Sequence, residues 1–293
     1  MKTILVTGGT DGIGKGIAMH FLKKGDRVIV VGSSSAKGDL FLNETRQLGV
    51  EERAIFLQAN LSLVKENKRI IEDLKSRFNS LDRVVFCATS HKQNKEYSET
   101  QEGFEFSFGL SYLSRFVLGF GLKEVLEKSD NPVVLNVCAP GMNGTVNLDD
   151  IQNKSNYNGA KAKYHGSRLN DLLGVAFAQN DTVGKIKYIL FNPWAVQTSG
   201  TFDAIENPVT KSMMKLIYKI IGKPVEEAIL PIIELLENPP SSALSAYKQR
   251  KEVSLSMKTF NRENAHKLYT KTVQLLKGRK IFPIGFDPLK ISN

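Results

Sequence analysis

The sequence has few of the residues that mark zinc-binding or disulfide-stabilised proteins. Its 293 residues include two cysteines and four histidines, and no Cys/His spacing suits a zinc site. No metal is therefore predicted. Cys87 and Cys138 each end an apolar strand pattern, which indicates buried, reduced thiols; a redox pair between neighbouring strands is the alternative.

Long apolar runs are also missing. The N-terminal apolar run is too short for the core of a signal peptide, and no stretch approaches the ~18 apolar residues that a membrane-spanning helix needs. We therefore predict a cytoplasmic protein. The chain has no internal repeats or low-complexity tracts, and its 41% hydrophobic content is enough to bury one sizeable core.

Acidic residues are in deficit, with 30 Asp and Glu against 40 Lys and Arg, which gives a formal net charge of +10. Such a charge attracts nucleic acid, anionic lipid or a phosphorylated ligand. The basic residues are scattered and accompany no DNA-binding motif, so we predict no nucleic-acid partner.

Strand-like and helix-like patterns alternate along the chain. This alternation is typical of an α/β fold with a doubly wound parallel sheet and helices on both faces, whose ligands bind at the carboxyl ends of the strands. The predicted strands are 3–6, 27–31, 54–58, 83–86, 132–137 and 187–191, and amphipathic helices are predicted near 63–78, 101–127, 157–179 and 262–277.

A glycine-rich turn follows the first strand directly. The segment 7–14 reads Thr-Gly-Gly-Thr-Asp-Gly-Ile-Gly, and Ile13, Ile17 and Phe21 then recur at helical spacing. Glycines at a strand-to-helix junction let a pyrophosphate approach the backbone N–H groups and the positive end of the helix dipole. A plain tight turn is the alternative. In this context we predict a dinucleotide-binding Rossmann fold.

Three motifs together resemble those of the short-chain dehydrogenase/reductase family. They are the glycine turn at 7–14, a Tyr-x-x-x-Lys pair at Tyr157 and Lys161, and Asn192-Pro193 followed by Thr198. The segments 102–105 and 265–269 are most similar to the retinol dehydrogenase branch.

The resemblance covers nearly the whole chain and implies its organisation. We expect a single NAD(P)-binding domain over residues 1–293. It includes a lid segment at about 199–237 and a basic C-terminal extension at about 241–293, which follows the break at Pro239-Pro240.

Tyr157 and Lys161 are the predicted catalytic pair. Four residues apart on one helix, they share a face, so the ammonium brings the phenol from its usual pKa of ~10 towards the working pH. Tyrosine then serves as a general acid or base; an ordinary amphipathic pair is the alternative. By resemblance, Tyr157 passes a proton to the substrate oxygen and Lys161 also binds the nicotinamide ribose.

Four positions of the family's site carry other residues. Ala139 stands where the catalytic serine is expected. Ser111 replaces an asparagine that helps to hold a water, and we predict that its hydroxyl takes over this catalytic role. Losing one hydrogen-bond donor to the substrate carbonyl costs ~10²–10³ in rate, so we expect weakened activity. Trp194 replaces a glycine beside the nicotinamide, and Asn60 replaces an aspartate that contacts adenine.

The predicted cofactor is NADP, with NAD as the alternative. NAD-selective sites place a carboxylate at the end of the second strand, whereas segment 32–37 has no acid and offers Ser33, Ser34 and Lys37 to a 2′-phosphate. A serine-rich loop with a helix cap suits either cofactor. The predicted cofactor-binding residues are Thr7, Gly8, Thr10, Asp11, Gly12, Ile13, Gly14, Ser33, Ser34, Lys37, Asn60, Leu61, Ala88, Tyr157, Lys161, Pro193, Val196 and Thr198.

Segment 211–223 gives the substrate prediction. Its lysines recur every four residues, and apolar residues fill much of the remaining surface, as in a basic amphipathic helix. It lies where the family carries its substrate lid, and its methionines indicate an apolar substrate. A lid packed on the core is favoured over contact with an anionic membrane. The predicted substrate-pocket residues are Ala139, Met142, Trp194 and Phe202.

Two functions stay open from the sequence. The first is an NADP-dependent oxidoreductase that transfers a hydride to or from a carbonyl, an alcohol or an activated C=C bond, the last as in protochlorophyllide reductase. The second is a dinucleotide-binding sensor or partner-binding protein with little turnover. Helices near 101–127 and 157–179 form the dimer contact in many relatives, so a homodimer is expected, although the aromatic density of the first helix also suits core burial.

Overall fold

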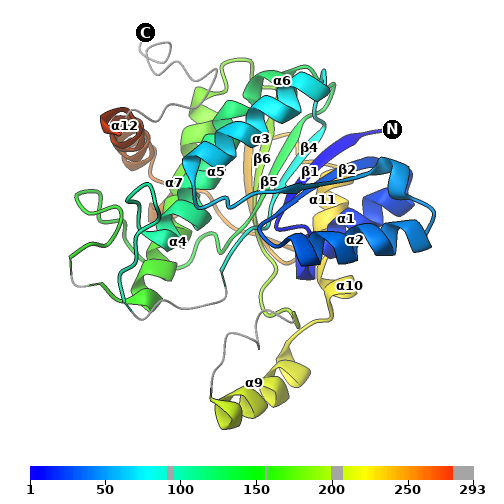
Figure 1. The fold of residues 1–293 in the computed structure, drawn as a ribbon. Coiled ribbons are helices and arrows are strands. Elements are labelled where there is room, and N and C mark those ends of the chain that lie inside the picture. Colours follow the sequence, from blue (N-terminus) through cyan, green and yellow to red (C-terminus); the bar gives the residue numbers. More distant parts are fainter. Residues whose placement is uncertain (91–95, 156, 199–206, 280–293) are drawn as a thin grey trace.

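One mixed sheet forms the centre of the molecule (Figure 1). The computed structural model describes residues 1–90, 96–155, 157–198 and 207–279. Every strand pair in the sheet is parallel except the last, β7 with β8. The strand order is β3-β2-β1-β4-β5-β6-β7-β8, with β1 Thr3–Thr7, β2 Arg27–Gly32, β3 Ala54–Gln58, β4 Arg83–Phe86, β5 Val133–Val137, β6 Lys187–Asn192, β7 Leu244–Lys248 and β8 Lys251–Glu252.

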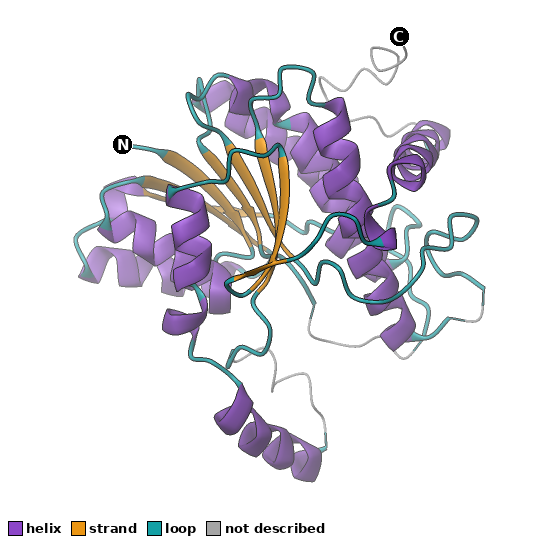
Figure 2. Cartoon of the chain, turned by 180° about the vertical axis from the view of Figure 1, so that it is seen from behind, coloured by secondary structure: helices purple, strands orange, loops and turns teal. Residues whose placement is uncertain are grey.

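Helices cover both faces of this sheet (Figure 2). One face carries α1 (Gly12–Lys23), α2 (Ser35–Gln47), α10 (Val225–Ala228) and α11 (Leu230–Glu237). The other carries α3 (Val64–Arg77), α5 (Ser114–Gly121), α6 (Lys123–Glu127), α7 (Gly159–Asn180) and α12 (Arg262–Gly278). Short elements are η1 (Glu51–Arg53), α4 (Phe106–Phe108), the π-helical η2 (Gly109–Leu113) and η3 (Lys258–Phe260), and α9 spans Pro208–Ile221. The predicted doubly wound α/β fold is confirmed.

The apolar strands fill both cores because alternate side chains point to opposite faces. On β1, Leu5 joins the core beneath α3, α5 and α7, whereas Ile4 and Val6 join the core beneath α1 and α11. All three side chains are fully buried. The continuous apolar run at the N-terminus therefore reflects a strand that is covered on both sides.

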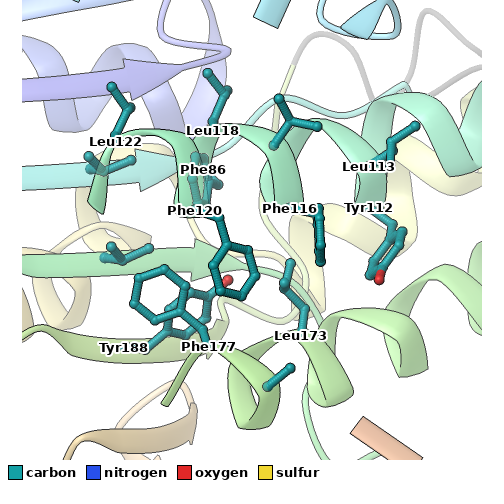
Figure 3. Close-up of a cluster of buried hydrophobic side chains, with 14 of the residues drawn as sticks. Phe86, Tyr112, Leu113, Phe116, Leu118, Phe120, Leu122, Leu173, Phe177 and Tyr188 are labelled. Carbon is teal, nitrogen blue, oxygen red and sulfur yellow. The ribbon is translucent and has the colours of Figure 1, made fainter. Parts of the chain in front are cut away.

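A row of aromatic side chains is buried between α5, α7 and α12 (Figure 3). Phe116 and Phe120 both pack against Tyr269 of α12, and Phe120 also packs against Phe177 of α7. The aromatic density of this region is thus explained by core burial. It gives no argument for a dimer contact, and the homodimer stays a prediction.

The described part of the predicted C-terminal extension packs onto the rest of the domain. It supplies β7 beside β6, the short β8, and α12, which packs on α7. The two helices α9 and α11 of the predicted lid segment are placed differently. Residues Ile232 and Leu236 of α11 are buried in the core, whereas α9 stands away from the body of the molecule (Figure 1). No helix among the described residues combines the length and apolar content needed to cross a bilayer.

Candidate active site

The larger of two cavities in the described residues lies at the carboxyl ends of the parallel strands and has a volume of about 620 Å³. It is the position expected for a ligand of this fold. Most of the predicted cofactor residues line it: Gly8, Thr10, Asp11, Gly12, Ile13, Gly14, Ser33, Ser34, Lys37, Asn60, Leu61, Ala88, Pro193, Val196 and Thr198.

The glycines of the first turn are required by close backbone contacts. Gly8 has φ +66°, and a Cβ there would lie 2.8 Å from Ala88 Cα. A Cβ on Gly14 would lie 2.3 Å from the carbonyl oxygen of Gly8. The turn therefore brings bare backbone to the cavity wall. Thr7 does not line this cavity; its buried hydroxyl oxygen accepts a hydrogen bond from the Ala88 amide, with N and O 3.4 Å apart.

The loop after β2 presents a cation to the cavity. The Ser34 hydroxyl caps α2 by accepting from the Lys37 amide. The Lys37 ammonium forms an ion pair with Asp11, with Nζ and Oδ2 2.6 Å apart, and both side chains are partly exposed. Asp11 also caps α1 by accepting from the Gly12 amide at 2.7 Å. Because the Lys37–Asp11 ion pair is exposed, an anion bound in the cavity can take the place of the Asp11 carboxylate beside the ammonium.

Asn60 and Leu61 line the cavity at the end of β3. The Asn60 side-chain oxygen accepts from the amide of Ser62 at 3.1 Å and from its hydroxyl at 2.8 Å. This local turn fixes the Asn60 side chain in the wall.

The structure contradicts the prediction that Tyr157 and Lys161 share a helix face at this cavity. Asn158 is the N-cap of α7, because its side chain accepts from the Lys161 amide, and the helix begins at Gly159. Tyr157 therefore precedes the helix. Neither Tyr157 nor Lys161 lines the two described cavities, and Lys161 is exposed.

The Tyr157 hydroxyl points to a carboxylate instead of to the Lys161 ammonium. It donates to Glu105 Oε1, with the two oxygens 3.1 Å apart, and the ring packs edge-on against Tyr97. Burial and the nearby Glu105 carboxylate raise the pKa of Tyr157 to about 12. The expected lowering by an ammonium is thus reversed, because both effects disfavour the phenolate.

Another face of α7 meets the cavities. The α7 residues that line the cavities recur at helical spacing, and Lys163 is the positively charged residue among them. Lys163 lines both the large cavity and a second one of about 210 Å³, which shares Thr89, Val137 and Cys138 with the first. The α7 residues at the second cavity are Gly159, Ala162, Lys163, Gly166, Ser167 and Asn170. Lys163 was not predicted, because the Tyr-x-x-x-Lys spacing selects Lys161, two positions earlier.

Ser111 and Ala139 both line the second cavity, as expected for residues near a substrate. The Ser111 carbonyl accepts from the Asn170 side chain at 2.9 Å. Met142 lines neither cavity; its carbonyl accepts from the buried Arg168 guanidinium. Phe202 lies outside the described residues. The predicted substrate pocket is therefore brought together only in part.

Trp194 borders the large cavity without filling it. It adopts φ +64°, a left-handed conformation that is uncommon for a non-glycine residue. Its amide donates to Asn192 Oδ1 at 2.8 Å, and the Lys248 ammonium lies 3.7 Å from the centroid of the indole. The indole is half-exposed at 51%, which places it on the rim of the cavity.

The two cysteines directly follow the neighbouring strands β4 and β5 and are free thiols. Cys87 and Cys138 both line the large cavity and are partly buried. Burial raises the pKa of each thiol to about 12. Both are therefore unreactive thiols at neutral pH. Among the described residues, no cluster of three or more His, Cys, Asp or Glu is placed to hold a metal.

Comparison with known proteins gives an indication of the family that is independent of the cavity. A family model described as short chain dehydrogenase matches residues 2–173. The chain is 24% identical over 287 residues to polyprenol dehydrogenase from Homo sapiens, covering 94% of this chain and 84% of that protein. It is 28% identical over 173 residues to retinol dehydrogenase 12 from Mus musculus, covering 59% of this chain and 54% of that protein.

Two solved structures of similar fold are complexes with nicotinamide cofactors. A short chain dehydrogenase from Shigella flexneri complexed with NADP superposes with a TM-score of 0.62 at 17% identity, covering 85% of this chain and 97% of that one. A 3-ketoacyl-(acyl-carrier-protein) reductase from Brucella melitensis complexed with NADH gives a TM-score of 0.63 at 19% identity, covering 84% and 96%. At these identities the likeness shows the fold alone.

Proposed function

The chain belongs to the short-chain dehydrogenase family, an oxidoreductase family that uses nicotinamide cofactors, and we propose that it uses NADP(H) to interconvert a carbonyl and an alcohol on an apolar small molecule. An activated C=C bond is the alternative acceptor. The observation that carries the proposal is the cavity that joins the glycine turn to the ends of β4, β5 and β6.

The residues of the cavity fit a dinucleotide. The positions at Gly8 and Gly14 leave no room for a Cβ, so backbone forms the wall where a pyrophosphate is expected. The amides at the start of α1 then face its negative charge. Asn60 and Leu61 would border the adenine, and Ala88, Pro193 and Val196 the nicotinamide. When bound, the nicotinamide supplies or accepts the hydride.

The preference for NADP rests on the loop after β2. No acid stands in segment 32–37 to repel a 2′-phosphate, and Ser33, Ser34 and Lys37 all line the cavity. A phosphate would replace Asp11 as the partner of Lys37, because a dianion attracts the ammonium more strongly than one carboxylate does.

Replacing Lys37 should separate the two cofactors. In Lys37→Ala the Kd for NADPH is expected to rise about tenfold, because a charge-assisted contact contributes about 1.5–3 kcal/mol, while the Kd for NADH changes little. Fluorescence titration with each cofactor measures this. Lys128→Ala is the control. Lys128 is an exposed lysine at the C-cap of α6 and pairs with Glu124 of that helix. Equal losses for NADPH and NADH in Lys37→Ala would refute the 2′-phosphate assignment.

Lys163 is our proposed proton donor in place of Tyr157. Its side chain lines both cavities, so it borders the region where the ring of the cofactor and the substrate would meet. An ammonium has three N–H donors and carries a proton to give. The Cys138 thiol also lines both cavities, but its pKa of about 12 makes it a poorer acid.

The walls of the large cavity support an apolar substrate. Phe106, Leu110 and Val137 line it near Lys163, and the Trp194 indole borders its rim. The first named relative acts on a polyprenol and another on retinol, by their names, and both alcohols are apolar.

A second candidate is a dinucleotide-binding protein with little turnover. It is favoured by the methyl group of Ala139 and by the hydrogen bond that directs the Tyr157 hydroxyl to Glu105. Titration with NADPH, followed by turnover assays on aldehydes, ketones and enones, separates the two functions. Cofactor binding without oxidation of NADPH by any of these compounds supports the second candidate and contradicts the first.

We also propose that α9 contacts an anionic membrane surface. Its side chains Met213, Leu216, Ile217 and Ile221 lie on one face and are 38–62% exposed. Lys215 and Lys219 are exposed on the opposite face. The predicted packing of this helix on the core is limited to its C-terminal end, where Tyr218 lines the large cavity, and the helix otherwise stands away from the body of the molecule (Figure 1). An exposed apolar face opposite a lysine-bearing face suits a helix that lies in the interface between water and anionic lipid.

Vesicle flotation tests this contact. The protein is expected to float with phosphatidylcholine vesicles that contain phosphatidylserine and not with pure phosphatidylcholine. Lys215→Glu/Lys219→Glu should abolish flotation, since each lysine near the surface contributes about 1 kcal/mol. Lys65→Glu/Lys128→Glu, two exposed lysines on other helices, is the matched control. Equal flotation with both variants would contradict a role for α9.

A further inference from the structure

We propose that the second cavity binds a carboxylate, held by Arg115, so that the substrate is an apolar molecule with an acidic end. The inference rests on the proposed oxidoreductase function, because the cavity opens towards the reaction site through Thr89, Val137, Cys138 and Lys163.

Arg115 is a buried cation in the wall of this cavity. The residue lies on α5 and is 5% exposed. Its Nη1 donates to Asn136 Oδ1 at 2.6 Å and to Asn170 Oδ1 at 3.3 Å, and its Nη2 donates to the Ala88 carbonyl at 3.2 Å. All of these acceptors are neutral. The guanidinium is thus held in place by amides and not by an acid.

One edge of the guanidinium is left unused. Its Nε has no hydrogen-bond partner among the described residues, and only three acceptors meet the five N–H donors of the group. The Nε–H and the neighbouring Nη2 have the fork geometry that carboxylates bind in a bidentate way; since Nε is buried without accessible surface, a carboxylate reaches it only when the side chains that cover it move aside. A buried polar group without a partner is costly, so an absent acceptor is indicated.

Charge compensation is also missing. In the described part of the chain no carboxylate is paired with Arg115, and burial lowers the pKa of its guanidinium. A buried charge normally has a partner of opposite sign, because its desolvation is otherwise unopposed. The second cation on the wall is Lys163, and none of the described residues that line this cavity is acidic. The field in the cavity therefore favours an anion.

The size and the other walls suit a carboxylate on a short chain. The volume is about 210 Å³, and an apolar cavity of ~150 Å³ in another protein holds benzene. Hydroxyl groups supply further donors to a carboxylate: Thr89, Ser90, Ser107, Ser111 and Ser167 line the wall. The carbonyl or alcohol carbon of such a substrate would then stand near Lys163, a few bonds from the acid.

Binding of sodium hexanoate, compared with hexanol, tests the proposal. Calorimetry on the protein without cofactor should show binding of hexanoate and at least tenfold weaker binding of hexanol, which has the same chain without the charge. Arg115→Met should lower the affinity for hexanoate at least tenfold and leave that for hexanol unchanged, whereas Arg115→Lys should retain part of it. Arg46→Met, an exposed arginine on α2, is the control.

The outcomes decide the proposal even if one variant fails. Circular dichroism and NADPH titration show whether Arg115→Met is folded; if it is not, the hexanoate and hexanol comparison on the wild-type protein still applies. Equal binding of the two probes, or hexanoate binding that persists in folded Arg115→Met, would overturn the carboxylate site. Because the binding of hexanoate and hexanol is measured without turnover and without cofactor, it is independent of the oxidoreductase assays.

Discussion

Gly14→Ala is expected to weaken NADPH binding by about 10- to 100-fold. The new Cβ would lie 2.3 Å from the Gly8 carbonyl oxygen, and this oxygen belongs to backbone that cannot rotate away. Overpacking of this kind costs about 1–3 kcal/mol, and about 1.4 kcal/mol corresponds to a tenfold change in Kd. The turn must shift, and the cradle for the pyrophosphate shifts with it. Fluorescence titration measures the loss.

Gly278→Ala is the matched control for this substitution. A Cβ at Gly278, the last residue of α12, meets nothing within 4 Å. NADPH affinity is therefore expected to stay at the wild-type value. Wild-type affinity in a folded Gly14→Ala variant would show that the cofactor does not bind at this turn.

Lys163→Met is expected to lower the rate of carbonyl reduction by ~10²–10⁴, the range that positioned acid–base groups contribute. The substitution keeps the length of the side chain and removes its proton. The Kd for NADPH should change much less, because Lys163 is one residue among many in the wall of the cofactor cavity. Single-turnover oxidation of NADPH, with aldehydes and ketones as substrates, separates the rate from the affinity.

Two controls distinguish this assignment from the pair predicted by sequence. Lys161→Met removes an exposed lysine from the same turn of α7, and Tyr157→Phe removes only the hydroxyl bonded to Glu105. Both variants should retain wild-type rates. If they lose the rate while Lys163→Met keeps it, the Tyr157 and Lys161 pair is catalytic and the present assignment is wrong.

The fold was predictable because its strongest signals are local. The apolar runs at 54–58 and 83–86 coincide with β3 and β4, and the glycine turn lies where β1 passes into α1. Cofactor residues at strand ends follow from topology alone, since parallel strands bring their carboxyl ends to one edge. Ser33 and Asn60 could therefore be placed without any long-range contact.

The face of α7 that lines the cavities was not predictable from spacing. A four-residue interval places two side chains on one face only if both lie within the helix, and the Asn158 cap starts α7 after Tyr157. Which face of α7 meets the cavity depends on its packing against β6 and α12. That packing selects Lys163 over Lys161, and no local pattern distinguishes the two.

The C-terminal segment was misread for a related reason. The strand β7 is short, and its sequence Leu-Ser-Ala-Tyr-Lys has no long apolar run. It becomes a strand by pairing with β6. Its basic neighbours suggested a separate piece of chain, but charge says little about whether an element is at the edge of a sheet.

The place of α12 has a consequence for how the protein is made. Tyr269 closes over Phe116 and Phe120, and Thr272 hydrogen-bonds the Tyr112 hydroxyl at 2.8 Å. These partners are separated by about half the length of the chain. During translation the aromatic row therefore stays uncovered until α12 has been synthesised and has left the ribosome, and a nascent chain stalled before Arg262 should depend on a chaperone to stay soluble.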